Sequence, residues 1–137
     1  MRRKTTILIL SICTIICIIC YYKQTKIEVI STQIMSSGNC MTLDLTIVLN
    51  TFTQPDCQKS AKEIVNHCIK NDFENIILSY DKGVPTELTA KVYLTQKDFQ
   101  KGICYYEMNY RLKENSEKCI YNIIENPDKY ILKIKKR

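Results

Sequence analysis

Two different periods of apolar residues follow each other in residues 41–71, which read MTLDLTIVLNTFTQPDCQKSAKEIVNHCIKN. In residues 41–49 apolar and polar side chains alternate, and this period of two predicts a strand with one buried face. After Pro55 the apolar positions recur every three or four residues, which predicts an amphipathic helix over residues 55–71. The apolar stripe of this helix consists of Cys57, Ala61, Ile64, Val65 and Cys68. A half-buried strand followed by a long amphipathic helix indicates an α+β domain.

Further strands are predicted on both sides of this region. Residues 26–36 are rich in Ile, Val and Thr, and residues 75–80, 87–95 and 103–112 have the composition or alternation of strands. We expect the last three to pair as an antiparallel meander. The predicted fold is therefore a mostly antiparallel sheet with one long amphipathic helix packed on its apolar face.

The C-terminal part gives a weaker pattern. Residues 116–125 are predicted to form a short helix that ends at Pro127. Residues 130–135 alternate between apolar residues and lysines, which is typical of an edge strand protected against pairing with other chains.

The amino-terminal segment differs from the rest of the chain. Residues 5–22 read TTILILSICTIICIICYY without a charge, and Arg2, Arg3 and Lys4 precede them. As a helix this run would reach about 27 Å, close to the hydrocarbon thickness of about 30 Å. We therefore predict an uncleaved, single-pass signal-anchor in residues 1–25 that precedes a domain of residues 26–137.

Two other interpretations of this segment are less favoured. A cleaved signal peptide would need small residues after the apolar run, and none is present. A lipidated cysteine is disfavoured because the bacterial lipoprotein signal usually has a small residue before the cysteine. Here an isoleucine precedes each of Cys13, Cys17 and Cys20. The basic amino terminus predicts a cytoplasmic start, so the domain would lie on the extracytoplasmic side of the cell membrane.

The charge of the domain argues against nucleic acid as a partner. The chain has a formal net charge of +6, and half of it comes from the three basic residues at the amino terminus. The remainder is too small to form the basic surface that nucleic-acid binding requires.

Five cysteines lie outside the amino-terminal segment: Cys40, Cys57, Cys68, Cys104 and Cys119. Cys57 and Cys68 would be about 16 Å apart on one helix, so they cannot pair with each other. In an oxidising compartment, one or two bridges could join Cys57 or Cys68 to one of the other three. Buried, unpaired thiols are the alternative of equal weight.

Catalytic chemistry finds little support in the sequence. His67 is the only histidine, it lies on the polar side of the predicted helix, and no residue nearby in the sequence would orient it for a thiol nucleophile. Asp72, Glu74 and Asp81 are expected to be solvated surface or turn residues rather than an acid/base pair. Phosphate-loop, serine-elbow, zinc-protease and EF-hand patterns are also missing. We therefore predict no catalytic, metal or cofactor site and no enzyme.

Binding is the function class that remains. Alternation predicts that Tyr93 and Tyr105 are exposed on neighbouring strands, where their rings could contact a partner. The leading hypothesis is a membrane-anchored extracytoplasmic binding or assembly module for a protein partner. The alternatives are a secreted or virion-surface domain stabilised by disulfides, and a thiol-dependent enzyme.

Overall fold

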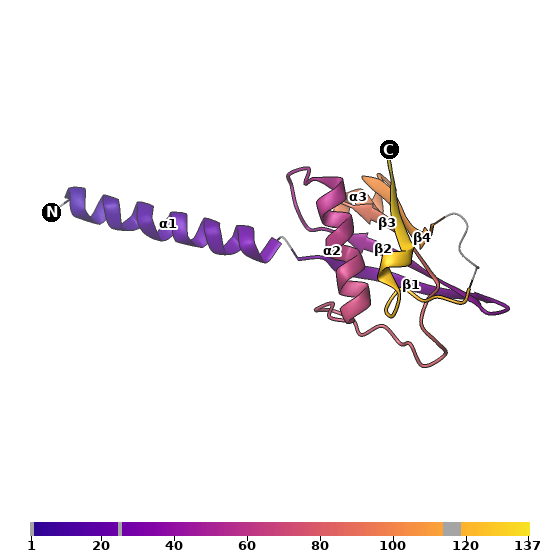
Figure 1. The fold of residues 1–137 in the computed structure, drawn as a ribbon. Coiled ribbons are helices and arrows are strands. Elements are labelled where there is room, and N and C mark those ends of the chain that lie inside the picture. The colour runs from indigo at the N-terminus through magenta and orange to yellow at the C-terminus, as the bar shows by residue number, and fades with distance from the viewer. Residues whose placement is uncertain (1, 25, 114–118) are drawn as a thin grey trace.

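The computed structural model describes residues 2–24, 26–113 and 119–137, and within the first helix it describes the side chains of residues 6, 7 and 9–19. Figure 1 shows that this helix, α1 (Arg2–Gln24), projects away from an α+β domain. Among the residues that the structure describes, no helix combines the length and the apolar character needed to cross a membrane.

The domain is built on a mixed five-stranded sheet. Its strands follow the order β1-β2-β3-β4-β5, so neighbours in the sequence are neighbours in the sheet. The β2–β3 pair is parallel, and the other three pairs are antiparallel. The strands are β1 (Glu28–Ser37), β2 (Cys40–Val48), β3 (Glu87–Tyr93), β4 (Tyr106–Leu112) and β5 (Tyr130–Lys136).

The parallel pair is connected by helix α2 (Cys57–Lys70), which packs across one face of the sheet (Figure 1). The helix begins after Asp56, whose carboxylate accepts hydrogen bonds from the backbone N–H groups of Gln58 and Lys59. It ends at Asn71, which adopts a left-handed conformation with φ of 53°. The helix therefore has 14 residues and is shorter than predicted at both ends, because Asp56 caps its start and the left-handed Asn71 ends it.

Residues 75–80 do not form the predicted strand, so the expected meander of three strands is wrong. The Asn71 side chain bonds both the N–H and the C=O of Leu78, at 2.7 and 2.8 Å, and holds this segment as an irregular connection. The chain needs this connection because a parallel strand can begin only after the chain has returned to the other end of the sheet.

The C-terminal helix is not observed in residues 119–125, which form turns, and residues 114–118 lie outside the described part. Pro127 begins the short 3-10 helix η1 (Pro127–Lys129) instead of ending a helix. Cys119 has a left-handed φ of 68°, which is incompatible with a regular helix at this position.

The predicted apolar stripes form the core. The inward side chains of β2 and the stripe of α2 are buried, with Leu45 at 1% and Ile64 at 0% exposure. The turn segment after Cys119 adds Ile123, which is also 0% exposed and whose N–H donates to the carbonyl of Pro85. One face of the sheet is thus covered by α2 together with this segment.

Candidate functional site on the open face of the sheet

The face of the sheet opposite α2 carries polar side chains in rows that run across the strands. In the first row Asp44 lies beside Thr89, which lies beside Asn109, which lies beside Lys133. The next row consists of Thr46, Lys91, Glu107 and Lys135. Because directly opposite residues on neighbouring strands have Cβ atoms about 5 Å apart, the two rows form one continuous polar surface. We call this surface the open face.

A shallow hollow of about 420 Å³ lies across these rows. Its lining includes the backbone and side chains of β3, β4 and β5, together with Asp44 from β2. Ligand sites have volumes of roughly 300 to 1,000 Å³ but are normally concave and mostly apolar. Because this hollow is open rather than enclosed, it is better suited to part of a larger partner than to an enclosed small molecule.

Some polar groups of the open face are already occupied by neighbours. Thr89 Oγ1 donates to Asp44 Oδ1 at 2.8 Å, and Arg137 forms an ion pair with Glu107 at 2.8 Å. Asn109 Nδ2 donates to Glu87 Oε1 at 3.0 Å. The acidic groups of this face are therefore partly neutralised from within the chain.

Other groups remain without a bond in the described part of the chain. Asn109 Oδ1 is buried and accepts no hydrogen bond from the described residues. Lys91, Lys133 and Lys135 form no ion pair within 4 Å there. The open face thus offers three ammonium donors to a partner, and this arrangement suits a partner with acidic groups.

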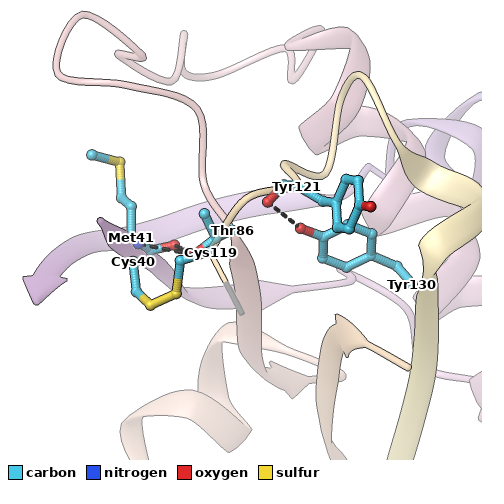
Figure 2. The surroundings of a disulfide bond; sticks show 6 residues. All are labelled: Cys40, Met41, Thr86, Cys119, Tyr121 and Tyr130. Atoms are coloured by element: carbon cyan, nitrogen blue, oxygen red, sulfur yellow. Dashed lines mark hydrogen bonds between the residues drawn. A yellow bond between two sulfur atoms is a disulfide. The ribbon is translucent and has the colours of Figure 1, made fainter. Parts of the chain in front are cut away.

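A disulfide joins Cys40, at the start of β2, to Cys119 in the turn segment, with a Cα–Cα distance of 4.8 Å (Figure 2). Next to it, the Thr86 hydroxyl accepts a hydrogen bond from the N–H of Met41 and donates one to the Met41 carbonyl (Figure 2). The Tyr130 hydroxyl donates to the carbonyl of Tyr121 at 2.9 Å (Figure 2). The bridge fixes the turn segment over the covered face of the sheet.

The combinations of cysteines suggested by the sequence do not include this bridge. Cys57, Cys68 and Cys104 are free thiols, so no bridge joins Cys57 or Cys68 to another cysteine of the domain. The physical reason is the direction of the helix stripe, which places Cys68 in the core at 0% exposure. Burial raises the pKa of the Cys68 thiol to about 12, and burial also raises the pKa of Cys104. These two thiols are protonated and poor nucleophiles at neutral pH.

The expectation that Tyr93 and Tyr105 are exposed is wrong, since their exposed fractions are 9% and 8%. Helix α3 (Gln96–Gln100) follows β3 directly and places Phe99 edge-on against Tyr93, with ring centroids 5.4 Å apart. Tyr105 precedes the first residue of β4, so strand alternation does not apply to it. Its hydroxyl donates to the carbonyl of Pro55 at 2.8 Å, which ties it to the start of α2.

His67 has a partner that the sequence analysis missed. Its Nδ1 lies 2.6 Å from Asp72 Oδ1, and its ring packs against Phe73 with centroids 5.3 Å apart. Asp72 follows the left-handed turn at Asn71, and this reversal brings the carboxylate back to the helix. The neighbouring Cys68 faces the core, so it does not complete a nucleophile pair with His67.

Within residues 2–24, 26–113 and 119–137, no group of three or more His, Cys, Asp and Glu side chains is placed to hold a metal ion.

Comparison of the chain with protein-family models, curated proteins and solved structures yields no match.

The sequence contains a signal for the open face. Alternation places Asp44, Thr89 and Lys91 on the polar sides of their strands. It could not show that these strands lie side by side, because the parallel pairing of β2 and β3 depends on the path of the chain between them.

Proposed function

We propose that this chain is a binding module that α1 holds at a membrane and whose open face contacts a protein partner on the extracytoplasmic side. The observation that carries the binding role is the open face itself, where three lysines form no ion pair with the described residues. Unpaired ammonium groups gathered on one surface favour contact with a partner that carries acidic groups.

The membrane anchor is supported by the apolar surface of α1. Residues 5–22 contain no charge, and the described isoleucine and leucine side chains of the helix are exposed, with Ile7 at 70% and Leu10 at 67%. A continuous apolar surface of this kind is unfavourable in water and is typical of contact with a membrane or a protein.

The disulfide supports the proposed location of the domain. Disulfides persist in oxidising compartments and are rare in the cytosol of most organisms. Together with the basic residues before the apolar run, the Cys40–Cys119 bridge favours a cytoplasmic amino terminus and an extracytoplasmic domain.

A secreted or virion-surface domain is the second candidate. It is favoured by the same disulfide, because disulfides also persist outside the cell. A thiol-dependent enzyme has less support, because the pKa values of Cys68 and Cys104 are raised rather than lowered.

The two candidates are separated by alkaline carbonate extraction of cells that express the full chain. Mass analysis of the amino terminus of the extracted chain completes the test. Retention in the membrane fraction with an intact amino terminus is expected for the anchored module. Recovery in the soluble fraction without the first residues would instead establish the secreted domain.

The binding role is tested with a photo-crosslinking amino acid in place of Lys133 on the open face. The same amino acid in place of Lys62, which is exposed on α2, is the matched control. We expect a discrete protein adduct from position 133 and none from position 62. The same adducts from both positions would contradict the assignment of the open face.

A further inference from the structure

The end of the sheet from which the chain leaves toward α1 has a surface of its own. We call it the proximal end, and the strand register brings together the residues that define it. They are Glu28, Val48, Tyr93, Tyr106 and Lys136. In Figure 1 the linker to α1 enters at this end, and the tip of the β1–β2 hairpin lies at the opposite one.

The loop of residues 49–56 is fixed at the proximal end beside the linker. Asn50 Nδ2 donates to the carbonyl of Lys26 and to Glu28 Oε2, both at 3.1 Å. The N–H of Leu49 donates to the carbonyl of Tyr93 at 2.9 Å, which ties the loop to β3 as well. The loop therefore has a defined position next to the point where the chain continues into α1.

Phe52 lies at the tip of this loop and faces outward. The flanking hydroxyls of Thr51 and Thr53 are 3.1 Å apart, and the N–H of Thr53 also bonds Thr51 Oγ1. Thr51 is buried at 8% exposure, whereas the Phe52 side chain is 81% exposed. A bonded turn thus holds a polar residue inward and an aromatic ring outward, which reverses the usual distribution.

A second exposed apolar residue and several basic residues accompany Phe52. Ile103, in the connection between β3 and β4, is 57% exposed. Two acids at this end have internal partners, since Asp98 accepts from Thr95 Oγ1 at 2.7 Å and Glu107 pairs with Arg137. The exposed basic residues of this end that form no ion pair with the described residues are Lys97, Lys101 and Lys136.

The short linker limits how far the proximal end can be from a membrane that holds α1. Only residues 25–27 separate Gln24 from Glu28. Three extended residues span about 10 Å, which is comparable with the depth of one headgroup region. An aromatic and a branched apolar side chain surrounded by lysines match the chemistry of an anionic bilayer surface.

We propose that the proximal end rests on an anionic lipid bilayer, with Phe52 and Ile103 inserted at the boundary between headgroups and acyl chains. This inference rests on the proposed anchoring by α1. It adds a second membrane contact that fixes the orientation of the domain, so that the open face is presented at a constant height above the lipid.

The absence of tryptophan from the sequence allows a direct test with single-tryptophan variants of the full chain. Phe52→Trp reports on the proximal end, and Leu10→Trp reports on α1. Ile120→Trp is the matched control, because Ile120 is 64% exposed and adjoins Cys119, which is bonded to Cys40 at the opposite end of β2. Each variant is reconstituted in phosphatidylcholine vesicles that contain phosphatidylglycerol, with and without brominated acyl chains.

We expect brominated lipid to quench most of the emission of Leu10→Trp and Phe52→Trp and to leave Ile120→Trp unchanged. A shift of Phe52→Trp emission to shorter wavelength should accompany the quenching. Circular dichroism of the three variants checks that each domain is folded.

Three results would overturn the proposal or a part of it, and they are distinguishable. Quenching of Leu10→Trp without quenching of Phe52→Trp would leave the anchor in place and remove the second contact. Failure to quench Leu10→Trp would remove the anchor, and the second contact with it. If Phe52→Trp is quenched as strongly in vesicles of phosphatidylcholine alone as in vesicles with phosphatidylglycerol, the proposed contact of the basic residues with anionic lipid is wrong.

Discussion

The two faces of the sheet come from the same alternating strands but have opposite properties. On the covered face, side chains such as Leu45 and Val92 are at 1% and 0% exposure under α2 and the turn segment. On the open face, Lys91 and Lys133 form no ion pair within the described residues and remain accessible. The comparison teaches that the stability of this domain is concentrated on one face, while the groups available for binding are concentrated on the other.

The largest effect is expected from a charge on the covered face. Ile64→Asp places a carboxylate where the native side chain is fully buried, and we expect a loss of more than about 4 kcal/mol of unfolding free energy. Lys62→Asp, on the exposed side of the same helix, should change it by less than about 0.5 kcal/mol. Urea unfolding of both variants measures the difference, and equal losses would show that the two sides of α2 were misassigned.

The next largest effect concerns the bridge that holds the turn segment on the covered face. Cys40 and Cys119 are 79 residues apart, so the bond closes a long loop of the unfolded chain. The double variant Cys40→Ser/Cys119→Ser should lose about 2 to 5 kcal/mol. Cys57→Ser, which removes a free and partly exposed thiol, is the control and should cost less than about 1 kcal/mol. A bridge variant as stable as its control would mean that the segment is held by packing alone.

A smaller effect is expected when the buried thiol of the covered face is titrated. Burial raises the pKa of Cys68 to about 12, whereas the pKa of a thiol in an unfolded chain is about 8.5. The folded state binds the proton more tightly, so its contribution to stability is complete below about pH 8.5 and is lost as the pH rises from there toward about 12.

Burial also raises the pKa of Tyr106 and Tyr130 to about 12, so part of the alkaline loss comes from these tyrosines. Urea unfolding at a series of pH values between neutral and mildly alkaline should therefore show a falling stability. The decline should be less steep in Cys68→Ala than in the parent chain. Identical slopes in the two chains would exclude the thiol as a cause.

The covered face was largely predictable from the sequence, and the arrangement of the open face was not. The burial of Leu45 and Ile64 follows from local periods, which operate over a few residues. The position of Lys133 beside Asn109 depends on strand order. The position of Thr89 beside Asp44 depends in the same way on the connection after α2, where the Asn71 side chain bonds Leu78 in place of a strand ladder.

The burial of the two candidate tyrosines was hidden for a related reason. By strand alternation Tyr93 belongs to the open face, but Phe99 covers it because α3 turns back at that point. Tyr105 is held by the carbonyl of Pro55, which is fifty residues away in the sequence. Contacts made by irregular segments leave no period in a sequence, and the Cys40–Cys119 bridge belongs to the same class.

The smallest effect on stability, and the sharpest contrast between the faces, comes from two adjacent residues of β5. Ile134 is partly buried against the core, whereas Lys133 is exposed on the open face. Ile134→Asp should therefore lose about 1 to 3 kcal/mol, because it places a charge against apolar side chains at a partly solvated edge. Lys133→Asp should stay within about 0.5 kcal/mol of the parent in urea unfolding. Because Lys133→Asp replaces an unpaired cation with an anion beside Asn109, it should weaken the proposed partner contact while the fold persists. Loss of the folded state in Lys133→Asp would show that the open face contributes to stability, and the division between the two faces would then be wrong.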